Sequence, residues 1–246
     1  MKKFLFGCGV AAFWLGVWTV LSLAVGQVLL VPSPLQTGKT LLTLLGQGEF
    51  YLSVLLSLVR VAAGFTCGVA AGTLFAALSH VCPPAGGFVK PLLTVVKATP
   101  VASFIVLALV WIKTDNVPVF ISFLMVTPVV WANVKEGLQN VPQDLKEVCI
   151  LYRFDRKKTL RHLYLPSVKP YFLAALDTSI GLAWKAGIAA EVLCRPDRSV
   201  GGAIWRAKLT LETPEVFAWT AVVVVLSLLL EELLHALLRP KKEEAV

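Results

Sequence analysis

Ionisable residues that interrupt apolar stretches are the groups of this sequence best suited to chemistry or solute movement. One set, spaced i, i+4, i+7, i+11 and i+14, comprises Asp177, Gly181, Trp184, Ile188 and Glu191. This spacing places a set on one stripe of an α-helix, and Lys185 lies beside it. Because charge within a bilayer is costly unless paired or hydrated, we expect a solute path here, with Trp184 and Lys185 nearest the solute. Alternatively, Asp177 and Glu191 lie in headgroup water at the helix ends and only Lys185 is buried.

Two more cations lie in apolar stretches. Lys97 precedes Ala-Thr-Pro100, so a cation and a helix break coincide, and broken helices often bound the solute path of transporters. Lys97 and Lys185 would suit an anionic solute, although two cations do not identify one. Arg60 has a structural interpretation instead, in which it pairs with a lipid phosphate or with Glu49.

Two patterns imitate enzyme motifs. The stretch from Ser33 to Thr40 ends like a phosphate-binding loop, but Ser33 replaces the first glycine and Pro34 lies inside the loop. Glu231 and His235 have helical spacing, but a zincin needs histidine at the first position. We interpret them as marking where the last helix leaves the bilayer, with an intramembrane hydrolase as the alternative. The five cysteines form no CxxC pair, so no disulfide framework or metal site is expected. Because both enzyme-like motifs are incomplete, no catalytic residue or cofactor is expected either.

The composition requires a membrane protein. Hydrophobic residues make up 57% of the 246 residues, charged residues only 15%, and the mean hydropathy is +0.77. Soluble domains carry about a quarter charged residues, and a membrane helix needs about 20 apolar residues. Six apolar blocks reach that length: 5–31, 52–78, 91–112, 117–135, 171–193 and 216–238. The sequence therefore predicts an all-α membrane protein with about six transmembrane helices, formed by residues 1–246 as a single domain.

The positions of the charges predict the orientation. Most of the 23 lysines and arginines lie near the two chain ends and between the fourth and fifth blocks. The positive-inside rule then places both termini in the cytoplasm. This topology and contact with lipid headgroups explain the net charge of +8, without nucleic acid. Glycines at 64, 68 and 72 predict close helix packing, with a dimer contact as the alternative.

The polar stretch between the fourth and fifth blocks has a pattern of its own. Asp144 and Glu147 are spaced as a capping box that begins a short helix, and Asp155 is expected to cap a second. Pro166 and Pro170 are expected to end that second helix before the fifth block. The apolar side of the second helix comprises Leu160, Leu163 and Tyr164. Two short helices with an apolar side suit insertion into a groove on a soluble partner.

The same stretch resembles a known motif. Glu147-Val148-Cys149-x3-Arg153-x9-Leu163-Tyr164-Leu165-Pro166 resembles the E-A-A-x3-G-x9-I-x-L-P loop of ABC importer permeases. The stretches Ser57–Phe65 and Trp184–Glu191 look like the second and fifth spans of the nitrate/sulfonate/taurine-type permeases. Here Val148-Cys149 replaces two alanines and Arg153 replaces the glycine, so the turn between the short helices must be built in another way.

The resemblance implies a type I ABC importer-like permease fold with a cytoplasmic coupling helix in residues 142–166. It implies a homodimer in the bacterial cytoplasmic membrane, with cytoplasmic ABC ATPase subunits and an extracytoplasmic solute-binding protein. The solute would be a small anion or an organic compound of the nitrate/sulfonate/taurine class. The rival hypotheses are a stand-alone secondary transporter or channel, for which inverted repeats are expected, and a plain membrane anchor.

Overall fold

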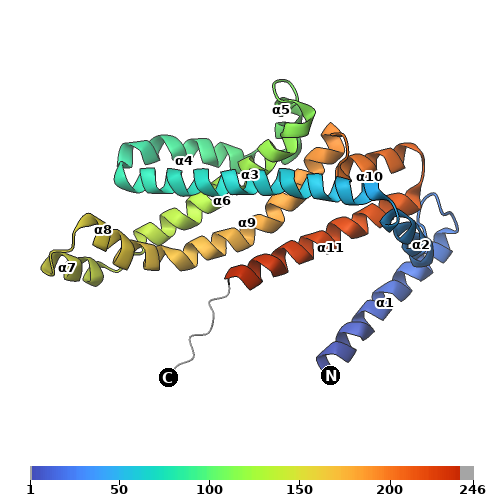
Figure 1. Ribbon diagram of the computed structural model, residues 1–246, viewed down its shortest axis with the longest axis horizontal. Coiled ribbons are helices and arrows are strands. Elements are labelled where there is room, and N and C mark those ends of the chain that lie inside the picture. The colour runs from blue at the N-terminus through green and yellow to red at the C-terminus, as the bar shows by residue number, and fades with distance from the viewer. Residues whose placement is uncertain (1, 239–246) are drawn as a thin grey trace.

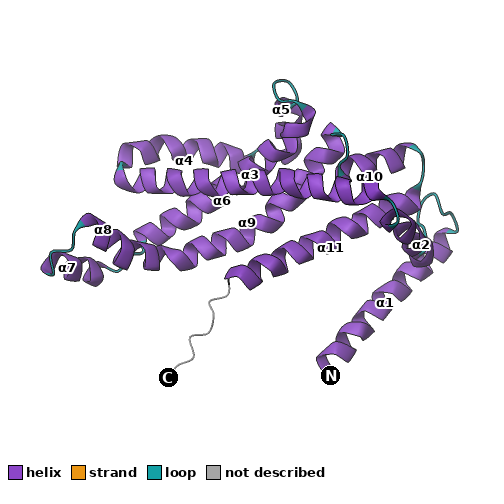
Figure 2. Ribbon diagram, in the orientation of Figure 1, coloured by secondary structure: helices purple, strands orange, loops and turns teal. Residues whose placement is uncertain are grey.

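The computed structural model describes residues 2–238, with side chains from residue 9 onward. Residue 1 and residues 239–246, including the basic C-terminal segment used for the topology, lie outside the described part. Within that part the chain is helical and contains no strand (Figure 2). Its elements are α1 (Lys2–Val25), α2 (Pro34–Leu45), α3 (Gly48–Val81), α4 (Pro83–Ala98), α5 (Val101–Ala108), a 3₁₀ turn (Thr114–Asn116), α6 (Val117–Gln139), α7 (Gln143–Leu151), α8 (Arg156–Thr159), a π-helical turn (Leu160–Tyr164), α9 (Leu165–Cys194), α10 (Val200–Leu209) and α11 (Thr213–Leu238).

Each of the six apolar blocks consists mainly of helix. Four helical segments are long and apolar enough to cross a membrane: Gly48–Val81, Thr114–Gln139, Arg156–Cys194 and Thr213–Leu238. The pair α4 and α5 makes up to a fifth, and Gly9–Val25 of α1 is a shorter apolar helix. This confirms the all-helical membrane class and a number of spans close to the predicted one.

The third block is a broken span. α4 and α5 are bent by 102° at Thr99 and Pro100, which confirms the break that was predicted after Lys97. Proline has no backbone N–H and its ring clashes with the preceding helical turn. The third span is therefore broken where the sequence predicted, although α4 begins earlier than the block 91–112, at Pro83.

The prediction that Pro166 and Pro170 end a helix was also wrong. Helix runs without interruption from Arg156 through the π-helical turn into α9. In that turn Leu165 N–H donates to the Leu160 carbonyl, five residues back. The wider turn lies immediately before Pro166, where a normal turn would clash with the proline ring. One helical segment, Arg156–Cys194, thus joins the polar stretch to the far end of the fifth span.

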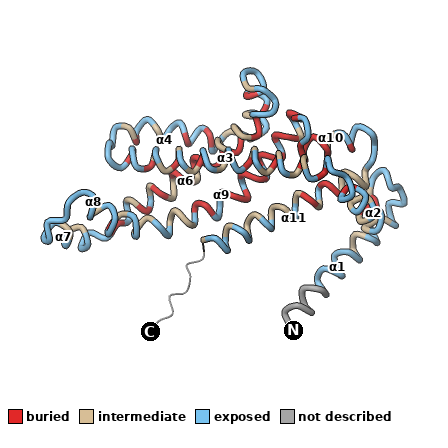
Figure 3. The backbone as a smooth tube through the Cα atoms, in the orientation of Figure 1, coloured by how far each residue is buried: buried red, intermediate tan, exposed pale blue. Residues whose placement is uncertain are grey.

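The core forms where α3, α6 and α9 pack (Figure 3). Gly64, Gly68 and Gly72 of α3 all face α6. A Cβ atom on Gly68 would lie 2.7 Å from Val126 Cβ, and one on Gly72 would lie 2.7 Å from the Thr127 carbonyl oxygen. Such close backbone approach is what small residues allow between membrane helices. The glycines therefore pack helices within one protomer, as the first of the two interpretations held.

Two short helices were not predicted. α2 contains the stretch that imitates a phosphate-binding loop, and there Ser33 accepts a hydrogen bond from Gln36 N–H as the N-cap. Ser199 caps α10 in the same way through Gly202 N–H. Figure 1 shows α2 and α10 near one end of the long axis, and α7 and α8 at the opposite end. The stretch that resembles the permease coupling motif thus lies at the end with α7 and α8.

Candidate coupling and translocation sites

The coupling segment, residues 142–166, carries an exposed apolar helix. α7 extends beyond the bundle (Figure 1) and none of its residues is buried. Five large apolar side chains on or next to it are exposed: Leu145, Val148, Ile150, Leu151 and Tyr152. Burial of apolar surface is the main favourable term in protein association. α7 is therefore a candidate docking surface.

The turn after α7 explains how Arg153 replaces the family's glycine. Arg153 has φ of 51°, in the left-handed region that favours glycine. Its N–H donates to the Ile150 carbonyl, and Phe154 N–H donates to the Cys149 carbonyl at 2.9 Å. These two bonds form a Schellman motif. The turn thus keeps the geometry suited to glycine, with an arginine in the strained position.

The predicted caps of the two short helices had different outcomes. Asp155 does cap α8, because its carboxylate accepts a hydrogen bond from Lys158 N–H at 2.9 Å. Asp144 does not cap α7, which begins after Pro142; Asp144 lies inside the first turn instead. At this position the helix dipole stabilises the negative charge of Asp144, but the residue does not form the predicted capping box.

The remaining predicted coupling residues divide by exposure. Leu163 is 3% exposed and packs within the protomer, whereas Leu165 is 58% exposed. Glu147 and Pro166 are also exposed, and Cys149 is half-buried. A cavity of about 480 Å³ is lined by Cys149, Arg153 and Leu163 together with neighbours from α7 and α8. The structure therefore brings the two ends of the motif together around one cavity.

The stripe predicted on α9 is divided between two faces. Trp184 and Glu191 are fully buried within the protomer, whereas Asp177 and Lys185 are exposed. The Trp184 indole N–H donates to the Val223 carbonyl at 3.0 Å, which fastens α9 to α11. The expectation that Trp184 and Glu191 line a path was therefore wrong, because α9 turns that side toward the other helices of its own chain. The alternative that put Glu191 in headgroup water was wrong as well.

α11 contributes two groups that the sequence analysis placed at the membrane surface. His235 Nε2 lies 2.5 Å from Asp177 Oδ1. Glu231 lies against α9, since a Cβ atom on Gly181 would be 2.6 Å from Glu231 Oε1. The helical spacing of Glu231 and His235 was the available signal, but pattern alone could not show that α11 packs this face on α9. Both side chains come from α11 and therefore lie next to the side of α9 that carries Asp177.

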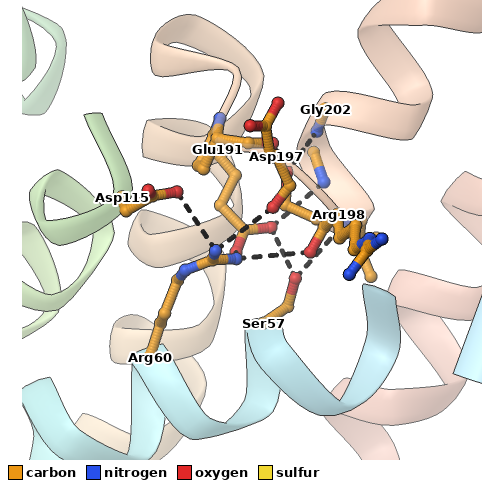
Figure 4. Close-up of polar contacts among 11 residues, drawn as sticks. Ser57, Arg60, Asp115, Glu191, Asp197, Arg198 and Gly202 are labelled. Carbon is orange, nitrogen blue, oxygen red and sulfur yellow. Dashed lines mark hydrogen bonds and ion pairs between the residues drawn. The ribbon is translucent and has the colours of Figure 1, made fainter. Parts of the chain in front are cut away.

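Glu191 lies at the centre of a buried polar network (Figure 4). Its Oε2 accepts hydrogen bonds from Ser57 Oγ–H at 2.7 Å and from Gly201 N–H at 3.1 Å. Ser57 Oγ in turn accepts a hydrogen bond from Val200 N–H at 3.0 Å. These two N–H groups belong to the first turn of α10, where the helix dipole favours a negative charge. One oxygen of the buried carboxylate, Oε2, thus receives hydrogen bonds from α3 and from α10.

Arg60 extends this network to two loops. Its Nη1 lies 3.6 Å from Glu191 Oε1, and its Nη2 lies 3.3 Å from Asp115 Oδ1. It also donates to the carbonyls of Asp197 and Arg198 (Figure 4). The suggested pairing of Arg60 with Glu49 was therefore wrong, because its carboxylate partners are Glu191 and Asp115. The stretches containing Ser57 and Glu191, which looked like two permease spans, meet in this network and hold α3, α9 and α10 together.

Lys97 does not join the other predicted path residues. It is exposed on the last turn of α4, and it makes no hydrogen bond or ion pair with the side chains described between residues 9 and 238. In that same part of the chain, no three His, Cys, Asp or Glu side chains gather closely enough to hold a metal ion. The charged groups therefore form a buried network around Glu191 and an exposed group around Asp177 and Lys185.

Comparison with known proteins extends beyond these local motifs. The family model described as "binding-protein-dependent transport system inner membrane component" matches residues 64–244. The bicarbonate transport system permease protein CmpB of Synechocystis is 30% identical, over 81% of this chain and 74% of that protein. The nitrate import permease protein NrtB of Synechococcus elongatus is 27% identical, over 79% and 73%. The taurine transport system permease protein TauC of Escherichia coli is 26% identical, over 90% and 82%.

A solved structure has the same fold. The crystal structure of an amino acid ABC transporter with histidines covers 78% of this chain and 93% of the compared chain, with a TM-score of 0.64 and 18% identity. The family match decides against a stand-alone transporter, a hydrolase or a plain anchor. This chain belongs to the binding-protein-dependent transport system inner membrane components and is the permease subunit of an ABC importer, not an enzyme, whose ATPase is a separate subunit.

Proposed function

We propose that residues 1–246 work as one permease domain that pairs with a second copy and binds an ATPase through residues 142–166. The observation that carries this proposal is α7, an apolar helix with no buried residue at the end of the molecule. Its sequence matches the permease coupling motif at both ends. The basic residues around it support a cytoplasmic position for this end and for both termini. The end with α2 and α10 then faces the solute-binding protein.

The solute path is proposed to run along the exposed face of α9, between the two copies. Asp177, Thr178, Lys185 and Ala189 are exposed along this face, and the charged residues among them are costly to expose to lipid. Its opposite side packs on α6 within the protomer. The solute is proposed to be a small anion or organic compound, as the names of the nitrate, bicarbonate and taurine permeases suggest.

The experiment is co-purification of the tagged chain from its native bacterial membrane in mild detergent, followed by mass spectrometry. The test variant combines Glu147→Ala and Leu165→Ala, two exposed residues of the coupling segment. The control combines Leu209→Ala and Glu212→Ala, which are exposed at the opposite end. We expect an ABC ATPase to accompany the wild type and the control, and to be reduced about tenfold or more with the test variant, which corresponds to about 1.4 kcal/mol of binding free energy.

Comparison of the two double variants shows whether ATPase binding depends on the coupling segment or on the opposite end of the molecule. An ATPase recovered equally with both double variants would contradict the role of residues 142–166, even though the family is established. Loss from the control alone would move the docking surface to the other end. Gel filtration of each preparation shows whether the variants are folded. Loss of the ATPase from a folded variant can then be assigned to the substituted surface residues.

A further inference from the structure

Two lysines and a histidine line a cavity between α3, α4 and α6, which we call the α3–α4–α6 cavity. Its volume is about 410 Å³, and volumes of a few hundred Å³ are typical of sites for small molecules or headgroups. It is lined by Ser79 and His80 of α3, Lys90 of α4, and Lys135 and Gln139 of α6, with the first turns of α4. None of the lining residues is acidic. The formal charges around this cavity are therefore all positive.

The packing beneath the cavity holds Lys135 in place. Ser79 is buried, and its Oγ donates a hydrogen bond to the Phe75 carbonyl at 2.6 Å. The same oxygen accepts a hydrogen bond from the Trp131 indole N–H at 3.3 Å, which fixes the indole against α3. Lys135 Nζ lies 4.8 Å from the centre of the Trp131 ring, a distance at which the ring face attracts a cation. The ammonium group is thus positioned at the cavity before any ligand binds.

Neither lysine has a carboxylate partner among the side chains that the structure describes. Within residues 9–238, no ion pair involves Lys90 or Lys135. Glu136 follows Lys135 in the sequence but does not line the cavity. Lys90 is exposed and Lys135 is half-buried. Because like charges around one cavity repel each other unless an anion lies between them, the cavity favours a negatively charged ligand.

The cavity lies near helix ends, where membrane helices meet the headgroup layer. His80 is one residue before the end of α3 at Val81, and Lys135 is four residues before the end of α6 at Gln139. Lys90 follows the first residue of α4, Pro83, by seven residues, which is roughly 10 Å along the helix axis. Lysine side chains near helix ends extend their ammonium groups toward the interface. The lysines can therefore reach the level of lipid phosphates.

α4 also has an apolar side that is open to lipid tails. Phe88, Leu92 and Val95 are 81%, 60% and 60% exposed. Their spacing of i, i+4 and i+7 places them on one side of the helix. A free phosphate ion would make no use of this surface, whereas the acyl chains of a lipid would cover it. The same helix thus contributes to a cationic cavity and to an apolar surface.

We propose that the α3–α4–α6 cavity binds the headgroup of an anionic phospholipid, with its phosphate at Lys90 and Lys135 and its acyl chains along α4. The proposal needs neither the coupling role of residues 142–166 nor the proposed solute path. A phosphodiester carries one negative charge and accepts charge-assisted hydrogen bonds from ammonium groups, and basic pockets between membrane helices suit such headgroups. Phosphatidylcholine would bring a choline cation to a cavity without a carboxylate, so it should bind more weakly.

The test is native mass spectrometry of the full chain, purified in mild detergent with the subunits that accompany it. The preparation is titrated with dioleoylphosphatidylglycerol or with dioleoylphosphatidylcholine. We expect phosphatidylglycerol to bind about tenfold or more tightly, because lysines near the membrane surface attract anionic headgroups. A double variant with Lys90→Gln and Lys135→Gln should lose most of this preference.

Three variants control for charge, folding and position. Lys90→Arg with Lys135→Arg keeps both cations and should retain most of the affinity for phosphatidylglycerol. Lys157→Gln with Lys158→Gln removes the same charge from two exposed residues of α8 that do not line the cavity, and it should bind like the wild type. Lys90→Gln alone, at an exposed position, should lose part of the affinity and keeps the test decisive if the double glutamine variant does not fold.

Three results would overturn the proposal. The first is equal affinity of the wild type for phosphatidylglycerol and phosphatidylcholine, which would mean that the cavity does not select an anionic lipid. The second is an equal loss of affinity in the variants of Lys90 and Lys135 and in the variant of Lys157 and Lys158, which would reduce the effect to net charge. The third is displacement of phosphatidylglycerol by inorganic phosphate at equal concentration, which would assign the cavity to free phosphate.

Discussion

Arg153 is the residue at which this chain differs most clearly from its family motif, and its backbone predicts the effect of restoring glycine. A non-glycine residue at φ of 51° costs about 1–2 kcal/mol of steric strain. Glycine would relieve this strain, but its greater conformational entropy in the unfolded chain offsets part of the gain in stability. Arg153→Gly should therefore stabilise the turn by up to about 1 kcal/mol. Hydrogen–deuterium exchange over residues 149–154 should slow by up to about fivefold.

The control for Arg153 is the same substitution in the next helix. Arg156 has helical backbone in α8, where glycine lacks the helix propensity of arginine. Arg156→Gly should leave exchange at 149–154 unchanged or speed it up. Faster exchange in Arg153→Gly than in the wild type would show that contacts of the arginine side chain outweigh its backbone strain.

Ser57 tests the buried network around Glu191. Its hydroxyl both donates to the carboxylate and accepts from Val200 N–H. Ser57→Ala would leave two buried polar groups without this partner, at a cost of about 1–3 kcal/mol for each group left unsatisfied. Thermal unfolding in detergent should show a lower midpoint temperature. Thr66→Ala, which removes an exposed hydroxyl on the same helix, is the control, and an equal fall in both variants would mean that the network adds no stability.

At the scale of elements, the glycines of α3 set its distance from α6. A Cβ atom on Gly64 would meet the Val119 carbonyl oxygen, and it would lie 2.7 Å from Ser122 Cβ. Gly64→Ala should push the helices apart and destabilise the protein by about 1–3 kcal/mol, as overpacking does. Gly87→Ala on α4 meets nothing within 4 Å and should be neutral or slightly stabilising. Thermal unfolding followed by fluorescence-detected gel filtration compares the two, and equal midpoints would contradict the close packing of α3 on α6.

The elements also show what the sequence could and could not predict. The length of the apolar blocks predicted the spans, and Pro100 predicted the break after Lys97. Both are local properties of the chain, so the sequence alone reveals them. The continuation of helix through Pro166 depends on a π-helical turn, which no local rule for proline anticipates. Glu191 and His235 were misplaced for another reason. Their partners, Ser57 and Asp177, lie more than 50 residues away, and only helix packing reveals them.

For the whole molecule, the exposed face of α9 makes a prediction about the dimer. α9 packs on α6 with one side and presents Asp177, Lys185 and Ala189 on the other. If two copies enclose the path there, this face of one copy lies opposite the same face of its partner, because a two-fold interface joins equivalent surfaces. Ala189 is small and exposed, so a cysteine there should fit without disturbing the helix.

Disulfide cross-linking of the intact protein in membranes tests this arrangement. The background replaces the five native cysteines, and Ala189→Cys is compared with Leu74→Cys, which is 65% exposed on α3. Oxidation with copper phenanthroline should give a dimer band for Ala189→Cys and little for Leu74→Cys, since a disulfide requires Cα atoms within about 7 Å. A dimer band from Leu74→Cys alone would put α3 at the two-fold axis. Asp177 and Lys185 would then lie away from the dimer axis, and the solute path would have to run elsewhere.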